Sequence, residues 1–145
     1  MNGGRLEPLS QETCLRLLRE GSIGRIAFVV DDDPLIFPVN YRLVEPSAGP
    51  LLAVRTRPGT VIEQAPSSVA FEIDYIDPIH HEGWSVLVRG ELVHATTSPK
   101  FQELYDPKSW VADRDSWLLI DPWTITGREL RGAEIVWPFR PGEYV

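Results

Sequence analysis

The sequence predicts a mainly β protein, a small β-barrel with short flanking helices. Two observations indicate this fold class. About six or seven short segments are rich in β-branched and aromatic residues and are separated by turn-forming residues, whereas only about two or three segments have the apolar spacing of a helix. The 145 residues are 43% hydrophobic, which is enough for one core, so we expect a single domain over residues 1–145.

The first half of the chain predicts a helix and then a hairpin. Leu9–Glu20 is amphipathic, Ser10 is suited to cap it, and Gly21 ends it. The segments GRIAFVV (Gly24–Val30) and LIFPVNYRLV (Leu35–Val44) are typical of strands, and the turn DDDP joins them.

The second half predicts the remaining strands. LLAVRT (Leu51–Thr56) is the third strand, and PGTVIEQAP after it is long enough for two helical turns. Further strands are expected over Ser67–Asp77 and over Gly83–Thr97, where Gly90 permits a bulge or a sharp bend. SPKFQELYDP predicts a short capped helix, and SWLLIDPWTITGREL with AEIVWP predicts the last strands.

Composition excludes several classes of function. The net charge of −7 and the pI near 4.9 argue against a nucleic-acid partner, because phosphate binding needs clustered Lys and Arg. Cys14 is the only cysteine, so no internal disulfide can form, and a reducing cytoplasmic location is expected. The sequence shows neither a signal peptide nor a run of about 18 apolar residues, so we expect no membrane partner.

The sequence gives little support for a metal site or for a catalytic nucleophile. His80 and His81 are adjacent, and adjacent residues of an extended segment point to opposite sides, so we expect no metal site. Cys14 lies within the amphipathic helix, where a buried apolar role is expected. The acidic run of residues 31–33 is typical of a solvated turn.

The stretch RTRPGT stands out as a cationic zone in an acidic chain. The Arg55 guanidinium can bind phosphate oxygens in a bidentate manner, and Arg57 adds charge. Thr60 offers a hydroxyl and an amide at the start of a short helix, whose N-terminus favours an anion. A phosphate site is therefore one interpretation, and a β-to-α turn with two solvated arginines is the other.

The order of these segments resembles the pyridoxamine 5'-phosphate oxidase-like, FMN-binding split-barrel family. The carrying motifs are GSIGRIAFVV, PLIFPVNY, LLAVRTRPGT, SSVAFEIDYID and GWSVLVRGELVHATT, in that order over residues 9–97; after Ser98 only IDPWTITGREL is similar. The resemblance implies a six-stranded antiparallel split barrel and a homodimer with two flavin sites between the subunits.

The resemblance also implies which residues bind the cofactor. One group falls where the family lays a strand along the isoalloxazine ring, namely Pro38, Val39, Asn40 and Tyr41. A second group falls at the ribityl phosphate, namely Arg55, Thr56, Gly59 and Thr60, with Arg57 beside them. Trp84 and Ser85 fall where the partner subunit approaches the flavin.

The chain departs from the family at one position. Many members carry a basic residue shortly after the turn glycine, whereas this chain has Val61 and Ile62 there. One charge-assisted contact worth about 1.5–3 kcal/mol is then absent, and FMN affinity falls by more than about tenfold. The family also includes proteins that bind a deazaflavin coenzyme, proteins that bind haem and proteins whose ligand is unknown, and the departure favours these alternatives.

The leading hypothesis is an FMN-dependent oxidoreductase that acts on a small-molecule substrate with NAD(P)H as a possible electron donor. Tyr41, Trp84 and Arg128 are candidates for substrate contact, and a solvated hairpin arginine is the other interpretation of Arg128. The alternatives are a carrier or sensor without turnover, and a dimeric scaffold with an emptied site. Three more tryptophans are expected in the core or the dimer interface, at positions 117, 123 and 137.

Overall fold

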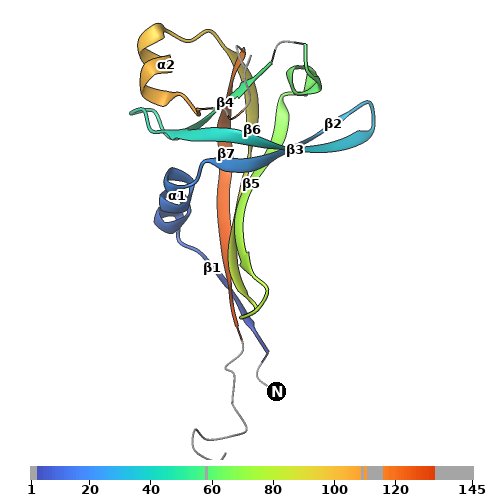
Figure 1. Cartoon of the computed structure of the whole chain (residues 1–145), viewed down its shortest axis with the longest axis vertical. Helices are drawn as coiled ribbons and strands as arrows, with labels where there is room; N and C mark the ends of the chain where they lie inside the picture. The colour runs from blue at the N-terminus through green and yellow to red at the C-terminus, as the bar shows by residue number, and fades with distance from the viewer. Residues whose placement is uncertain (1–2, 58, 109, 111–115, 133–145) are drawn as a thin grey trace, which may run out of the picture.

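The protein folds as one antiparallel β-sheet that curls into a ring, with two helices packed outside it (Figure 1). The computed structural model describes residues 3–57, 59–108, 110 and 116–132. The strands are β1 (Arg5–Pro8), β2 (Ile23–Val30), β3 (Asp33–Val44), β4 (Leu51–Thr56), β5 (Ser68–Asp77), β6 (Glu82–Ala95) and β7 (Ser116–Arg131). The helices are α1 (Gln11–Glu20), the 3-10 turn η1 (Val61–Gln64) and α2 (Pro99–Tyr105).

Strand β7 closes the ring because it pairs with strands on both of its sides. The sheet order is β1-β7-β4-β3-β2-β5-β6, and β6 returns to β7. The first part of β7 pairs with β4 through Thr56↔Ser116 and with β6 through Ala95↔Trp117. Strands β2 to β7 thus form the predicted six-stranded antiparallel barrel, and β1 is an additional seventh strand.

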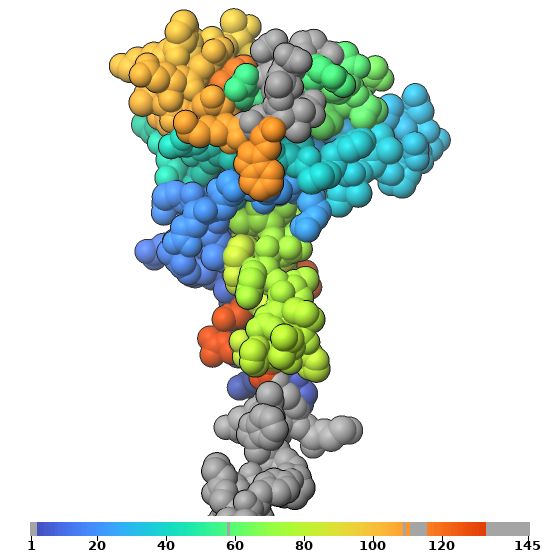
Figure 2. All heavy atoms as spheres, in the orientation of Figure 1, coloured from blue at the N-terminus to red at the C-terminus, as the bar shows by residue number. Residues whose placement is uncertain are grey.

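One end each of β5, β6 and β7 leaves the ring, and the whole of β1 pairs there. We call this part the arm and define it as residues 5–8, 74–77, 82–85 and 128–131. Its sheet order is β1-β7-β6-β5, and β1 pairs with the end of β7 through Leu6↔Leu130. Figure 2 shows the arm as a narrow stem below the broader ring.

The ring is filled by apolar side chains, and α1 packs against this core. Phe71 is 0% exposed and contacts the ring of Tyr41 edge-on, with 4.9 Å between their centroids. Cys14 and Leu18 of α1 are also 0% exposed and join this core. Burial raises the pKa of the Cys14 thiol, which fits the predicted apolar role.

Local sequence signals account for several of these elements. Ser10 caps α1 as predicted, since its hydroxyl accepts a hydrogen bond from the Thr13 amide at 3.1 Å. The predicted bulge lies between Arg89 and Gly90, and a Cβ on Gly90 would lie 2.3 Å from the Asp121 carbonyl oxygen.

Other elements differ from the sequence predictions. The segment expected to form two helical turns forms only the four-residue η1. Strand β1 was not predicted, and β7 runs unbroken from Ser116 to Arg131, so Arg128 lies within a strand and not in a hairpin turn. The predicted strand AEIVWP and Trp137 lie outside the described residues. Within the described residues, no helix has both the length and the apolar character needed to cross a membrane.

Candidate functional site

A groove of about 280 Å³ opens where β3, the end of β4 and η1 meet. We call it the β3–β4 groove. Strand register brings its parts together, because Tyr41↔Val54 is the last pair of the β3–β4 ladder and the preceding β3 residues continue beyond it. The groove is lined by Phe37, Pro38, Val39, Asn40, Arg55, Thr56, Arg57, Thr60, Val61 and Ile62.

The lining combines a largely apolar strand with a cationic turn. Strand β3 supplies the apolar residues from Phe37 to Val39, and η1 adds Val61 and Ile62. The end of β4 and the turn after it supply two arginines and two threonine hydroxyls. Such a groove can hold a ligand that has a flat apolar part and an anionic part.

Asp106 and Trp117 are among the residues that hold Arg55 in place. Its guanidinium donates to the Asp106 carboxylate at 3.1 Å and lies 5.5 Å from the centre of the Trp117 ring. Partial burial raises the pKa of Asp106, but the Lys108 amide and the Arg55 guanidinium outweigh it and hold that pKa below its ordinary value. Asp106 is therefore a charged partner of Arg55 at neutral pH.

The turn after β4 is ordered by its own hydrogen bonds. The Thr60 hydroxyl donates to the Arg57 carbonyl at 2.9 Å, so at the 2.9 Å contact between the Thr56 and Thr60 hydroxyls the proton comes from Thr56. Gly59 has φ +78°, a left-handed conformation that favours glycine. Hydrogen bonds within the chain thus connect Thr56, Arg57 and Thr60.

A carboxylate of the chain accepts a hydrogen bond from a backbone amide of this turn. Glu63 accepts a hydrogen bond from the Gly59 amide at 2.8 Å. Hydrogen bonds from Ser116 and from Gly59 lower the pKa of Glu63. Sequence reasoning placed Gly59 beside a phosphate, whereas here its N–H is already satisfied, and Gly59 does not line the groove.

Tyr41 points away from the groove. Its side chain is 2% exposed, and its hydroxyl donates to the Leu18 carbonyl at 2.8 Å, which anchors α1 to the ring. The Tyr41 phenol therefore belongs to the core and does not face the groove, so the predicted substrate contact has no support from this geometry. Asn40 does line the groove, and its side-chain oxygen accepts the Trp110 amide at 3.1 Å.

The remaining predicted residues lie on the arm. Trp84, Ser85 and Arg128 line a separate cavity of about 180 Å³ together with exposed apolar residues such as Leu6 and Ile76. Ser85 and Arg128 are direct cross-strand neighbours. A single chain therefore presents the predicted site in two parts, one at the groove and one on the arm.

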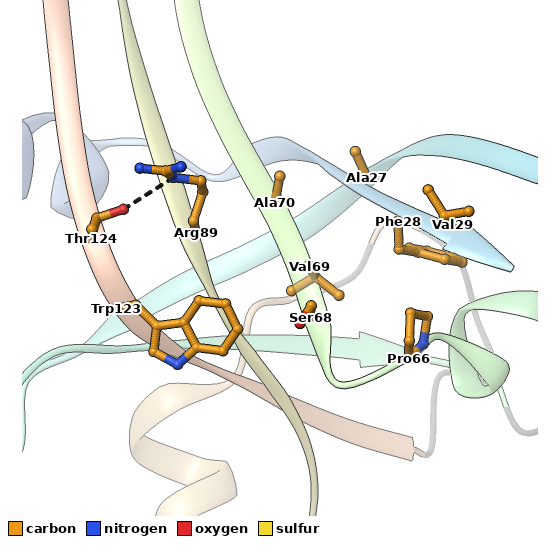
Figure 3. A pocket seen from close by; sticks show the side chains of 10 residues that line it. All are labelled: Ala27, Phe28, Val29, Pro66, Ser68, Val69, Ala70, Arg89, Trp123 and Thr124. Atoms are coloured by element: carbon orange, nitrogen blue, oxygen red, sulfur yellow. Dashed lines mark hydrogen bonds between the residues drawn. The ribbon is translucent and has the colours of Figure 1, made fainter. Parts of the chain in front are cut away.

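A further cavity of about 420 Å³ lies on the outer face of β2, β5, β6 and β7 (Figure 3). Arg89 is the charged residue of its lining and bonds the Thr124 hydroxyl at 3.3 Å. Trp123 stands at its edge and is 62% exposed, so it is not a core residue, whereas Trp117 is buried. No sequence motif pointed to this cavity.

Two functional candidates were missed by sequence reasoning. Asp106 follows α2 and is 51 positions from the Arg55 that it contacts. Glu63 was part of an expected helix and was assigned no role. The sequence signal for both is only an acidic residue near the end of a short helix. Their contacts can therefore be identified only from the folded structure.

Comparisons with known proteins agree with this geometry. A family model described as pyridoxamine 5'-phosphate oxidase matches residues 10–129. The uncharacterized protein Rv0080 of Mycobacterium tuberculosis is 32% identical over 130 residues, covering 82% of each chain. The structure of an FAD binding protein from Mycobacterium smegmatis has 29% identity and a TM-score of 0.67, covering 88% of this chain and 100% of that one.

A second solved structure is a conserved protein of unknown function from Corynebacterium diphtheriae. It has 27% identity and a TM-score of 0.72 over 85% of this chain and 96% of that one. The family match begins at the cap of α1 and ends at residue 129, within the part of β7 that belongs to the arm. The similarity therefore includes the β3–β4 groove and most of the arm.

Proposed function

The chain belongs to the pyridoxamine 5'-phosphate oxidase family, and from this premise we propose that it is a flavin-dependent oxidoreductase that holds FMN in the β3–β4 groove. The flavin, when bound, supplies the hydride and electron chemistry. The chain supplies binding, orientation and exclusion of water. No side chain of the groove is required as a general acid or base.

The observation that carries this proposal is the composition of one groove. Phe37, Pro38 and Val39 offer a flat apolar edge to a ring, while Arg55 and Arg57 offer positive charge to a phosphate. These residues fit FMN, whose ring is flat and whose tail ends in a phosphate. The FAD binding protein of Mycobacterium smegmatis, which has the same fold, supports a flavin as the class of ligand.

We propose further that the site is completed by a second copy of the chain. The groove of about 280 Å³ lies below the range of roughly 300–1,000 Å³ that is typical of ligand sites. Trp84 and Ser85 lie on the arm, next to exposed apolar residues. In a homodimer the arm of one subunit could cover the flavin of the other, with Arg128 near the substrate.

Flavin titration tests the proposed site. Purified protein is titrated with FMN while flavin fluorescence and absorption are followed, and saturation at one FMN per subunit is expected. Arg55→Ala removes charge-assisted bonds worth about 1.5–3 kcal/mol, so affinity falls by about tenfold to a hundredfold. Arg16→Ala is the matched control, because Arg16 is an exposed arginine on α1 that pairs with Glu20.

Two outcomes would redirect the proposal. If the Arg55→Ala variant and the control bind FMN with equal affinity, the cofactor does not bind in the groove. No FMN binding by the unaltered protein would favour a deazaflavin coenzyme or haem, which are tested in the same way. Reduction of the bound flavin by NADH or NADPH separates an oxidoreductase from a carrier or sensor that binds without turnover.

A further inference from the structure

Two carboxylates of the chain are bonded to groups that the sequence placed beside a ligand phosphate. Asp106 is bonded to the Arg55 guanidinium at 3.1 Å, and Glu63 is bonded to the Gly59 amide at 2.8 Å. Together with Arg57, these side chains carry two positive and two negative formal charges. Among the described residues these four charges cancel, and the Lys108 cation near Asp106 adds one positive charge, so the two arginines of the groove lining are largely offset by carboxylates of the chain itself.

A phosphate in the groove has to share Arg55 with Asp106. A guanidinium binds phosphate best through two parallel N–H donors, and the carboxylate already accepts from one terminal nitrogen. The two anions also repel each other, and partial burial weakens solvent screening, since the Arg55 and Asp106 side chains are 23% and 34% exposed. Val61 adds no charge that would offset this repulsion.

We propose that Asp106 is a specificity-determining residue of the β3–β4 groove: its carboxylate disfavours a ligand tail that ends in a doubly charged phosphate, relative to a neutral tail. This inference rests on the proposed function, because it concerns how the same groove selects among flavins. Asp106 sets the penalty through Arg55, whereas Glu63 is bonded to the turn backbone and maintains the shape of the turn.

The pair of riboflavin and FMN isolates the effect, since the two share one ring and differ in the terminal phosphate. Dissociation constants are measured by fluorescence quenching at pH 8 for the full chain and for Asp106→Asn. The amide keeps an oxygen that can accept the Lys108 amide, which the Asp106 carboxylate accepts at 2.9 Å. We expect FMN affinity to rise by about fivefold or more, with riboflavin affinity changed by less than about twofold.

Glu103→Gln is the matched control. Glu103 is exposed on the same helix α2, so the variant changes the net charge equally without touching Arg55. We expect the same ratio of FMN to riboflavin affinity as in the unaltered protein. The gain in Asp106→Asn should also shrink as salt is added, because screening weakens the repulsion. Circular dichroism and the melting temperature verify that each variant is folded.

The outcomes separate this inference from the proposed function. A fall in FMN affinity in Asp106→Asn would overturn the inference and make Asp106 a residue that positions Arg55 for the phosphate. An equal change for FMN and riboflavin would also overturn it, while flavin binding itself stands. If neither the unaltered protein nor the variant binds any flavin, the proposed function fails and the inference fails with it.

Discussion

Apolar residues are buried in the ring and exposed in the arm, although β5, β6 and β7 run through both parts. In the ring, Phe71 of β5 is 0% exposed, whereas Ile76 of the same strand is 67% exposed in the arm. The ring has no free edge because β7 closes it, while the arm ends in β1 on one side and β5 on the other. The ring thus buries its own apolar side chains, whereas the arm exposes an apolar surface suited to an interface.

The largest effect is expected from a substitution in the ring. Phe71→Ala removes a fully buried ring that contacts Tyr41, so the free energy of unfolding should fall by about 3–5 kcal/mol. Ile76→Ala on the same strand should lower it by less than about 0.5 kcal/mol, because an exposed side chain loses little. Urea denaturation at a low concentration, where the chain is monomeric, measures both. Equal losses would contradict the distinction between ring and arm.

The contrast also explains which elements the sequence could predict. The ring strands alternate apolar and polar residues, so their existence and approximate ends follow from a period of two. Gly90 predicted the bulge, because a residue without a Cβ is needed where the backbone of β6 lies close to the Asp121 carbonyl. Strand β1 has only four residues, RLEP, too few to show an alternation of apolar and polar residues. It forms because the backbone N–H and C=O groups at the end of β7 are available for pairing on that side.

Prediction of the site from sequence was less complete. The RTRPGT turn and the β3 residues before Tyr41 could be placed together through the family resemblance, and they do line one groove. The direction of the Tyr41 side chain could not be predicted, since it depends on which face of β3 meets α1. Asp106 could not be predicted either, because its bond to Arg55 depends on how α2 packs, and no local pattern records that.

The second effect tests the arm as an interface. Ile76→Asp places a charge on the exposed apolar arm, and burying an isoleucine is worth about 1.5–3 kcal/mol. The proposed dimer should therefore weaken by about tenfold or more, and flavin affinity should fall with it. Sedimentation velocity measures the association. Leu104→Asp is the control, since Leu104 is 50% exposed but lies on α2, away from the arm; equal dissociation in both variants would remove the arm from the interface.

A third effect arises where the ring meets the arm. Burial first, and then the Asp74 carboxylate, raise the pKa of Glu72 from 4.5 to about 7, although Arg25 lies 3.6 Å away and opposes the shift. The Oε1 atom of Glu72 is buried and has no hydrogen-bond partner among the described residues. The junction therefore contains a carboxyl group that favours its neutral form below about pH 7.

This raised pKa predicts a dependence of stability on pH. Between pH 4.5 and about 7 the folded chain holds a proton on Glu72 that the unfolded chain releases. The free energy of unfolding should therefore fall as pH rises through that window, by about 1 kcal/mol once partial solvent screening is considered. Glu72→Gln should flatten this part of the profile, measured by urea denaturation at pH 5 and pH 8. An unchanged difference between the two pH values would assign the dependence to other groups.

The smallest effect is expected from the ion pairs of the arm. Arg131 lies 3.8 Å from Glu7 and 3.5 Å from Glu129, and its side chain is 63% exposed. Such pairs contribute little, so Arg131→Ala should change the free energy of unfolding by less than about 0.5 kcal/mol, and added salt should erase the difference. Strand β1 would then be held by its backbone ladder and by the apolar Leu6 and Leu130. Faster amide exchange along β1 in Arg131→Ala would contradict this. It would mean that ion pairs, and not the backbone ladder, keep β1 paired with β7.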